Sequence, residues 1–353
     1  MTLHIFNPEH DIALASNLAN FTAPHAGRQL RGDLGFLPAL WAAEGDAVLV
    51  ECAPLARQRY ARLQRRLQAP QVRFVERGDL PQLAFDAVQP WGWDRALRAQ
   101  LLRWGVSGVP AEGVVDVHRQ LSHRRTSSLL LPQLLMEGTV GESCECSTVD
   151  EVLQVAAQWQ RVVLKAPWSS SGRGVRFVAD PSLLTTDAHL SGWLRNLLQQ
   201  QVNVMVEPLY NKVKDFALEF WAEASGRIRY EGLSLFHTVN GAYTGNVVAT
   251  EDAKRHQLSR YVSLALLDRV TERIVSTLRL QGYEGPFGID MMVVDVQGAT
   301  LLHPCVEINL RRTMGHVALA LQRLLITDGD PDRRYTMLVD YDGNNYKLKI
   351  HRL

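Results

Sequence analysis

One hairpin, with the sequence GIDMMVVDVQGATLLHPCVEINL, constrains the fold of this chain more than any other stretch. Residues at equal distances from the centre of its Gln-Gly-Ala-Thr turn should face each other, which places Asp290 opposite Glu307. Directly opposed residues lie about 5 Å apart, and like charges there are destabilising unless a cation neutralises them. Asn309 shares the face of Glu307, because side chains alternate along a strand. Two carboxylates and an amide oxygen predict a site for Mg²⁺, with Mn²⁺ as the alternative ion.

Two other interpretations of the facing carboxylates are open. A retaining glycosidase also uses two carboxyl groups about 5 Å apart, one as nucleophile and one as acid, but that chemistry has no use for Asn309 or for Lys165. A solvated hairpin face would account for the charges, but it conflicts with the apolar Met-Met-Val-Val and Leu-Leu segments beside them.

A second stretch, VVLKAPWSSSGRGVRFV over residues 162–178, carries Lys165 between two apolar, strand-like segments. Lysine is scarce, with six among 38 basic residues, so a lysine in an apolar run suggests a function. Successive backbone N–H groups in the serine- and glycine-rich turn form the kind of concavity that binds an anion, and lysine adds a mobile charge. The stretch predicts a phosphate site, although it matches neither a Walker A loop nor a dinucleotide fingerprint; a plain hairpin is the alternative. The residues of this candidate site are Lys165, Ser169, Ser170, Ser171, Gly172 and Gly174.

Composition excludes several classes of protein. A net charge of +1 gives no bulk bias toward nucleic acid or an anionic membrane, and no apolar run reaches the roughly 18 residues that span a bilayer. The N-terminus lacks the basic and apolar regions of a signal peptide, and the four cysteines have no paired metal-ligand spacing. We therefore expect a cytoplasmic protein with reduced thiols, whose partners are small molecules and include neither nucleic acid nor membrane.

The chain is long enough for two or three packed units, since it has 353 residues. The first third alternates strands and helices, which predicts a small open parallel sheet. Its strands are expected at 3–6, 47–51 and 71–76, with a helix over 54–68. Later helices are expected to begin at Ser122 and after Thr148 and to run over 256–281, and hairpin turns are expected at 225–226 and 342–345.

The order of these features resembles the ATP-grasp superfamily of carboxylate-amine and carboxylate-thiol ligases. Lys165 precedes a glycine-rich loop, an acidic hinge follows at Val-Glu-Pro-Leu-Tyr, and Asp215 comes before the Gly-Ile-Asp and Glu-Ile-Asn segments. The resemblance covers about residues 110–325 and implies an α/β fold that begins with a small parallel-sheet domain. The implied domains are an N-terminal domain over 1–110, an ATP-grasp domain over 111–330 with subdomains of about 111–206 and 207–330, and a C-terminal hairpin over 331–353 packed on it.

Carried over position by position, the resemblance implies that ATP and Mg²⁺ are cofactors. Lys165 and the turn over 169–174 would contact the phosphates, together with Arg124, or Arg125 beside it, where family members commonly have lysine. The other implied contacts are Glu207 and Tyr210 at adenine, Asp215 at ribose, and Asp290, Glu307 and Asn309 at magnesium. After the metal strand, one of Arg311 and Arg312 would be catalytic by stabilising the charge of phosphoryl transfer.

The resemblance also implies a reaction. A carboxylate would be phosphorylated with release of ADP, and an amine would then attack the acyl phosphate. Positioning phosphates against a carboxylate needs little covalent chemistry from the protein, which fits a sequence without a convincing Ser-His-Asp or Cys-His set. The alternatives are a kinase that transfers phosphate to a small molecule, and a module that binds ATP without turnover.

Candidate residues for the substrate are assigned from their place in the sequence. His10 and Arg28 follow the first strand, and ligands of open α/β sheets lie beyond the carboxyl ends of strands; a turn with a helix cap is the alternative. Tyr243 and Asn246 are expected to form a second wall, with a hairpin turning at Asn-Gly as the alternative. Both the carboxylate and the amine are expected to be small molecules.

Overall fold

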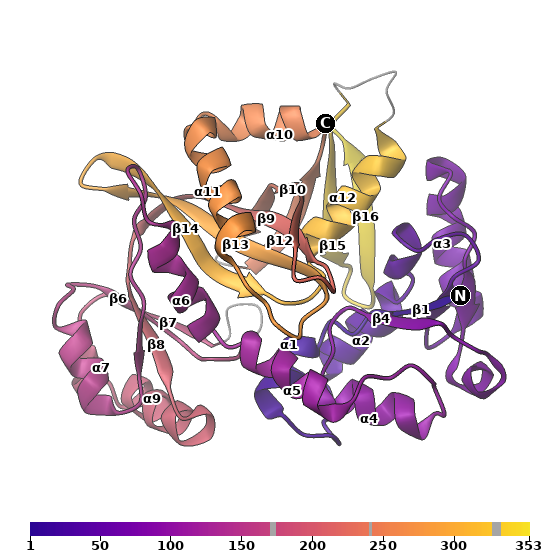
Figure 1. Cartoon of the computed structure of the whole chain (residues 1–353), viewed down its shortest axis with the longest axis horizontal. Coiled ribbons are helices and arrows are strands. Elements are labelled where there is room, and N and C mark those ends of the chain that lie inside the picture. The colour runs from indigo at the N-terminus through magenta and orange to yellow at the C-terminus, as the bar shows by residue number, and fades with distance from the viewer. Residues whose placement is uncertain (170–173, 240–241, 327–332) are drawn as a thin grey trace.

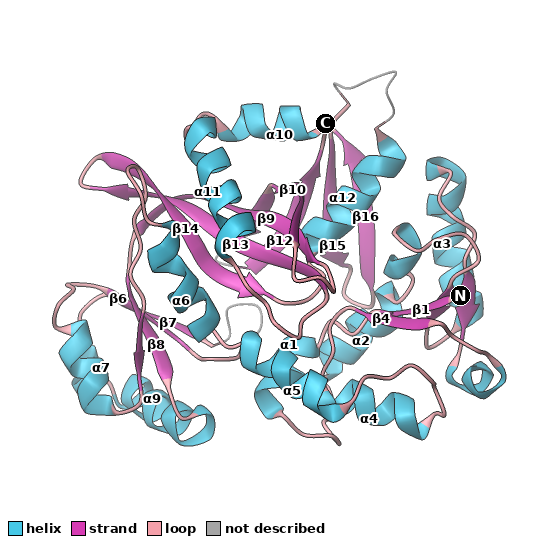
Figure 2. Ribbon diagram, viewed as in Figure 1, coloured by secondary structure: helices cyan, strands magenta, loops and turns pink. Residues whose placement is uncertain are grey.

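The computed structural model describes residues 1–169, 174–239, 242–326 and 333–353, and within them it contains four four-stranded sheets. Figure 1 shows the sheet of β6, β7 and β8 at the lower left, the N-terminal sheet with β1 and β4 at the right, and the sheet of β9 and β13 between them. Helices lie around all of them (Figure 2).

The N-terminal sheet is parallel, as its alternation of strands and helices predicted, and has the order β3-β2-β1-β4. Its fourth strand, β4, was not predicted, because its four residues end in proline and carry little apolar signal. The strands are β1 (Thr2–Ile5), β2 (Ala47–Leu49), β3 (Arg73–Val75) and β4 (Ala87–Pro90). The helices are α1 (His10–Ser16), α2 (His25–Leu34), η1 (Leu37–Leu40), α3 (Ala53–Leu67), η2 (Arg77–Gln82) and α4 (Arg95–Arg103).

The sheet that carries Lys165 is antiparallel and has the order β5-β8-β6-β7. Helix α7 begins after Thr148 as predicted, with a capping box in which the Glu151 N–H donates to the Thr148 Oγ1 at 3.2 Å. The strands are β5 (Cys144–Cys146), β6 (Val162–Lys165), β7 (Val175–Val178) and β8 (Val204–Pro208), and the helices are α7 (Val149–Ala156), α8 (Leu183–Thr186) and α9 (Ala188–Gln201).

The central sheet has the order β10-β9-β13-β14 and two unlike faces. One face carries Phe216, Leu218 and Ile289, which pack in a core with helices α6 (Arg125–Leu134) and α11 (Leu264–Thr277). Because side chains alternate, Asp215 and Asp290 belong to the other, polar face. The strands are β9 (Asn211–Ala222), β10 (Ile228–Ser234), β13 (Gly285–Val296) and β14 (Ala299–Asn309). The predicted hairpin at 225–226 joins β9 to β10.

The predicted C-terminal hairpin is present and forms part of a fourth sheet, in the order β11-β12-β15-β16. Met337 and Tyr335 share an apolar core with Leu34 and Trp91 of the N-terminal region, so the hairpin also packs there. The strands are β11 (Phe236–Val239), β12 (Ala242–Val248), β15 (Tyr335–Tyr341) and β16 (Tyr346–Arg352), and helix α12 (Met314–Leu325) packs against β12. The domain limits at 110 and 330 stay predictions.

Two predicted helices were wrong in their limits. Ser122 begins no helix: its hydroxyl donates to the His118 carbonyl at 2.7 Å, at the end of α5 (Glu112–Leu121), and α6 (Arg125–Leu134) follows. The helix predicted over 256–281 is two helices, α10 (Glu251–Leu258), which Thr250 caps, and α11 (Leu264–Thr277). Within the described part of the chain, no helix has the length and apolar character needed to cross a bilayer.

Candidate active site

The predicted carboxylate pair is present on the polar face of the central sheet. Asp290 of β13 faces Glu307 of β14 directly, and Gly288 faces Asn309. Burial, and then the facing Glu307, raise the pKa of Asp290 to about 7. The Asn309 Nδ2 donates to the Asp290 Oδ2 at 3.1 Å, so Asp290 lies between the facing Glu307 and the Asn309 amide. Crowded carboxylates of this kind attract a cation.

The described residues contain no group of three His, Cys, Asp or Glu side chains that could hold a metal ion. The candidate set consists of two carboxylates and one amide, and these hard oxygens suit Mg²⁺. Burial and the facing Glu307 keep the pKa of Asp290 at about 7, although Arg124 lies 2.8 Å from Glu307 and Arg311 acts in the opposite direction on Asp290. The residues therefore fit a divalent cation, provided that the Asn309 amide oxygen, which accepts from the Arg311 Nη2 at 3.1 Å, becomes free.

Of the two neighbouring arginines, only Arg124 lies at the carboxylates. Its buried guanidinium donates from Nη2 to the Glu307 Oε1 at 2.8 Å and from Nη1 to the Ser169 Oγ at 2.8 Å. Arg125 points elsewhere and pairs with Glu145, its Nε lying 2.5 Å from the Glu145 Oε2. Arg124 thus connects strand β14, through Glu307, to Ser169 at the beginning of the serine-glycine turn.

Lys165 ends β6 next to the same strand. Its Nζ lies 2.5 Å from the Glu207 Oε2 and donates to the Val306 carbonyl, the residue before Glu307, at 3.4 Å. Both members of this ion pair are buried. Lys165, predicted to contact phosphate, therefore lies beside Glu207, predicted to contact adenine.

Part of the serine-glycine turn is described. A Cβ on Gly174 would lie 2.5 Å from the Ser169 Oγ, so only glycine leaves room for that serine. The Ala166 N–H donates to the Gly174 carbonyl at 2.7 Å, which closes the base of the turn. The predicted contacts Ser170, Ser171 and Gly172 lie outside the described residues.

The predicted ribose and adenine residues follow β8. Tyr210 packs edge-on against His303 with a ring-centroid distance of 5.9 Å, and burial raises its pKa to about 12. Asp215 faces the same side of the sheet as Asp290 and accepts from the Lys212 Nζ at 2.5 Å. These two positions extend the polar face beyond the carboxylate pair.

Arg311 and Arg312 follow each other in sequence but have different surroundings. Arg311 makes a two-pronged contact with Asp11, Nε to Oδ1 at 2.8 Å and Nη2 to Oδ2 at 2.7 Å, beside Asn309. Arg312 instead lies over the ring of Trp41 at 4.6 Å and the ring of Trp221 at 5.6 Å. Arg311 is therefore the one of the two that lies with the carboxylates.

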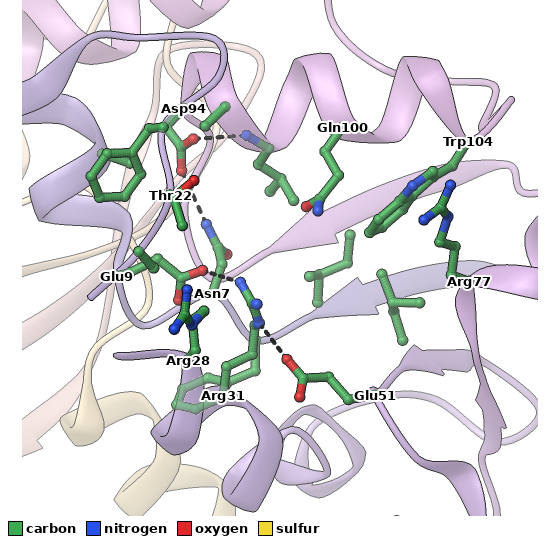
Figure 3. A pocket seen from close by; sticks show the side chains of 18 of the residues that line it. Asn7, Glu9, Thr22, Arg28, Arg31, Glu51, Arg77, Asp94, Gln100 and Trp104 are labelled. Carbon is green, nitrogen blue, oxygen red and sulfur yellow. Dashed lines mark hydrogen bonds and ion pairs between the residues drawn. The ribbon is translucent and has the colours of Figure 1, made fainter. Parts of the chain in front are cut away.

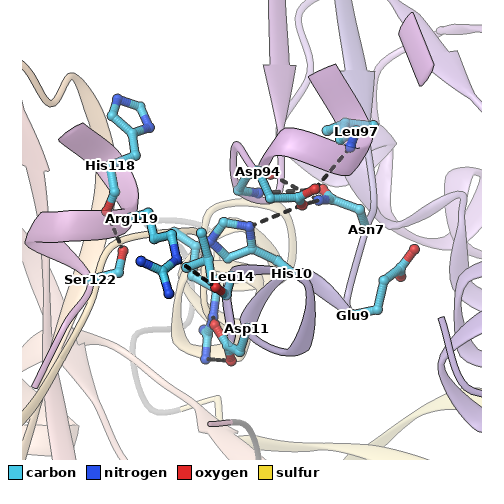
Figure 4. A network of polar contacts seen from close by, with 12 residues as sticks. Asn7, Glu9, His10, Asp11, Leu14, Asp94, Leu97, His118, Arg119 and Ser122 are labelled. Atoms are coloured by element: carbon cyan, nitrogen blue, oxygen red, sulfur yellow. Dashed lines mark hydrogen bonds and ion pairs between the residues drawn. The ribbon is translucent and has the colours of Figure 1, made fainter. Parts of the chain in front are cut away.

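His10 lies between the N-terminal sheet and the metal strand but is 2% exposed. Its Nδ1 is 3.4 Å from the Asp94 Oδ2, and the Asn7 Nδ2 donates to the same oxygen at 3.2 Å. Figure 4 shows His10 turned toward Asp94, with Asp11 lying apart from that contact. The neighbouring Asp11 is the α1 side chain that reaches Arg311.

Arg28 lines a cavity of about 620 Å³ beyond the carboxyl ends of the N-terminal strands. Figure 3 shows Glu9, Arg28 and Arg31 on one wall, and Gln100, Trp104 and Arg77 across from them. Arg31 pairs with Glu9, whose other oxygen, Oε2, is buried without a hydrogen-bond partner among the described residues. Such an oxygen favours a ligand that donates a hydrogen bond.

Tyr243 and Asn246 lie on β12 and are bonded to each other. The Tyr243 hydroxyl donates to the Asn246 Oδ1 at 2.6 Å, and the fully buried Asn246 donates from Nδ2 to the Ser234 Oγ at 2.8 Å. Neither residue lines the cavity at Arg28. The structure therefore does not bring the two halves of the predicted substrate site together.

The sequence analysis missed Glu219, which is 1% exposed on the polar face of β9. Its Oε2 lies 3.0 Å from the Nδ1 of His316 near the start of α12. That nitrogen accepts from the Thr313 N–H, and the other ring nitrogen faces the Phe220 carbonyl. Burial raises the pKa of Glu219 to about 8, so a protonated Glu219 can donate to His316. The signal in the sequence was a lone acid within the apolar strand Phe-Ala-Leu-Glu-Phe-Trp.

No protein-family model and no curated protein matches this sequence, whereas solved structures do. N5-carboxyaminoimidazole synthetase from Staphylococcus aureus, solved with ADP, is 12% identical with a TM-score of 0.51, over 97% of this chain and 83% of that one. The N5-carboxyaminoimidazole ribonucleotide synthetase from Thermus thermophilus has a TM-score of 0.48 and 13% identity over 96% and 83%. D-alanyl-alanine synthetase A from Vibrio cholerae has a TM-score of 0.44 and 15% identity over 76% and 89%. The likeness to the first of these confirms the fold that the ATP-grasp resemblance implied.

Proposed function

We propose that this chain is an ATP- and Mg²⁺-dependent ligase that joins a carboxylate to an amine through an acyl phosphate and releases ADP and phosphate. The observation that carries this proposal is the convergence of Arg124, Lys165 and Arg311 around the facing carboxylates Asp290 and Glu307. The shared fold with a synthetase solved with ADP supports it.

The basic and the acidic residues would have different roles in binding the nucleotide. Lys165, Arg124 and the turn at Ser169 would bind the ATP phosphates, and Asp215 the ribose, while the chain after β8, from Glu207 to Tyr210, would lie along the adenine. Asp290, Glu307 and Asn309 would hold Mg²⁺, which neutralises phosphate charge when it is bound. Nucleotide binding on this face would draw Arg124 and Lys165 from their carboxylate partners to the phosphates.

Arg311 would act on the charge that moves during transfer. It is held by Asp11 beside Asn309, so its guanidinium is fixed before the substrate arrives. A positioned cation lowers the barrier when negative charge develops on the phosphoryl group and on the acyl oxygen. Arg312, which points away, has no part in this step.

The carboxylate substrate would enter from the side of α1. Arg28 faces the cavity of about 620 Å³, where the unpartnered Glu9 oxygen would accept from an amine or hydroxyl of the substrate. His10, the first residue of α1, would keep the helix in place through Asp94. Tyr243 and Asn246, on β12, would have to approach α1 to form a second wall. A cytoplasmic location with free thiols completes the proposal.

ADP release tests the reaction. Pools of carboxylates should be screened with ATP and Mg²⁺, with and without amines and with hydroxylamine as an acyl-phosphate trap. A ligase gives ADP together with a hydroxamate from one carboxylate. ADP without a hydroxamate indicates a small-molecule kinase, and tight ATP binding without ADP indicates a non-catalytic module.

A further inference from the structure

The guanidinium of Arg312 has no close ion-pair partner among the described residues, and Glu231 acts on it only from a distance beyond 4.0 Å. The residue is 9% exposed, and within the described ranges its side chain donates no hydrogen bond and has no carboxylate within 4.0 Å. Its contacts with Trp41 and Trp221 are with ring faces. Burial lowers the pKa of Arg312 to about 10, and Tyr283 and Glu231 offset this effect only in part. Buried charges in proteins are normally paired, so the position favours an anionic ligand.

Arg312 lines a cavity of about 540 Å³ that is separate from the one at Arg28. The cavity lies between the edge strand β4, helix α5, the end of β9 and the beginning of β13. Its size falls within the range of about 300–1,000 Å³ that is typical of small-molecule sites. The aromatic residues among those that line it are Trp91, Trp93, Trp221 and Tyr283.

The residues that line the cavity indicate which chemical groups a ligand would have. Trp221 and Tyr283 offer flat apolar surface, and the Tyr283 hydroxyl is already used, because it donates to the Pro286 carbonyl. His118 lies beside Tyr283 and is uncharged near neutral pH, because burial lowers its pKa to about 4. Asp86 and Glu284 also line the cavity. Arg312, whose guanidinium lies over the ring of Trp221, is the arginine among its lining residues. A guanidinium matches the two oxygens of a carboxylate.

We propose that this cavity binds a small aromatic carboxylate, with the carboxylate on Arg312 and the ring among the tryptophans. The site lies apart from the nucleotide face, since Arg311 and Arg312 point into different surroundings and only Arg311 reaches Asn309. The proposal does not depend on the proposed ligase activity, and its ligand need not be the substrate of that reaction.

Benzoate is the minimal probe for this site. Binding of benzoate to the nucleotide-free, full-length protein should be measured by calorimetry and compared with benzyl alcohol, which keeps the ring without the charge, and with acetate, which keeps the charge without the ring. We expect benzoate to bind at least tenfold more tightly than either one. Equal affinities for benzoate and benzyl alcohol would contradict the role of Arg312.

Two variants locate the binding. Arg312→Met removes the charge and keeps the bulk, and Val114→Phe fills the cavity from α5 without touching the arginine; each should weaken benzoate binding at least tenfold. Arg269 is an exposed arginine on α11, and the variant Arg269→Gln should bind benzoate as tightly as the wild type does. If Arg312→Met does not fold, as judged by circular dichroism, Val114→Phe decides alone. Unchanged affinity in the folded variants, or no benzoate binding by a wild type that still binds ATP, overturns the proposal.

Discussion

Single side chains decide which charges meet at the candidate site. Lys165 and Arg124 each contact a carboxylate that belongs to the nucleotide face, Glu207 and Glu307. Each pair holds its buried cation in place, because removing one partner of a buried pair is far more costly than removing one partner of an exposed pair. In the proposed function, both cations would exchange a carboxylate for a phosphate when the nucleotide binds.

Lys165→Ala should weaken ATP binding by about 1.5–3 kcal/mol, because it removes a charge-assisted phosphate contact. The measurement is calorimetric titration of ATP into folded protein. Lys347→Ala is the matched control, since Lys347 is exposed and pairs with Asp342 in the C-terminal hairpin, with no contact to a proposed ATP-binding residue. Equal ATP affinities for the wild type and Lys165→Ala would remove Lys165 from the phosphate site.

The pKa of Glu219 predicts a pH dependence of stability. Its folded pKa is about 8 against an ordinary 4.5, so between these values the folded state holds a proton that the unfolded state has lost. The stability it contributes is therefore complete below pH 4.5 and is lost as pH rises toward 8, by up to about 1.4 kcal/mol per pH unit.

Glu219→Gln should flatten this slope, since the amide keeps a donor for His316 and does not titrate. Urea unfolding at pH 5, 6, 7 and 8 measures it. Glu231→Gln, on the neighbouring strand β10, controls for a general effect of charge. Asp290 and the buried histidines also titrate in this range, so the comparison of the two proteins decides. The same slope in the wild type and in Glu219→Gln would show that Glu219 is ionised in the folded protein.

At the scale of elements, helix α12 packs closely against the central sheet because position 315 is a glycine. Gly315 lies in the first turn of α12, where a Cβ would overlap the Glu219 Oε1 and lie 2.6 Å from the Ser234 Oγ. The helix can approach the polar face only because this position has no side chain. The same helix follows directly on Arg311 and Arg312, so its placement fixes both.

Gly315→Ala should destabilise the protein, although alanine is normally better than glycine in a helix by about 1 kcal/mol. The clash with buried Glu219 outweighs that gain, and we expect a net loss of about 1–3 kcal/mol. Gly113→Ala in α5 is the control: nothing lies within 4 Å of its added Cβ, so it should gain stability. Thermal melts compare the two, and a stabilised Gly315→Ala would show that α12 shifts freely.

For the whole molecule, the contact between Asp11 and Arg311 joins helix α1 to the segment after β14, across 300 positions of sequence. Its two parallel hydrogen bonds fix both partners in direction as well as distance. The cavity at Arg28 lies on one side of α1 and the carboxylate pair on the other. This contact therefore sets the position of the proposed substrate side relative to the nucleotide side.

Asp11→Asn should lower turnover by about tenfold or more, because it frees the guanidinium that we expect to stabilise phosphoryl transfer. ATP affinity should change little, because Lys165 and Arg124 are untouched. Steady-state kinetics with the identified substrate, together with ATP titration, separate the two effects. Asp268→Asn, which breaks an exposed ion pair with Arg255, should leave both quantities as in the wild type.

The sequence alone determined the features that depend on neighbours along the chain. The pairing of Asp290 with Glu307 followed from counting outward from one turn, because strand register is fixed when a short turn joins two apolar strands. The α7 cap and the parallel N-terminal strands followed in the same way from local patterns. The order of the motifs, read together, implied the fold.

Tertiary structure decided whatever depends on distant segments. Arg124 was separated from Arg125, and Arg311 from Arg312, by the partners that other elements supplied, Glu307 in one case and Asp11 in the other. Glu219 gained its importance from helix α12, which begins almost 100 residues later. The two arginines of each pair have the same propensity and the same charge, so only the packing of remote elements determines which of them reaches the carboxylates of the candidate site.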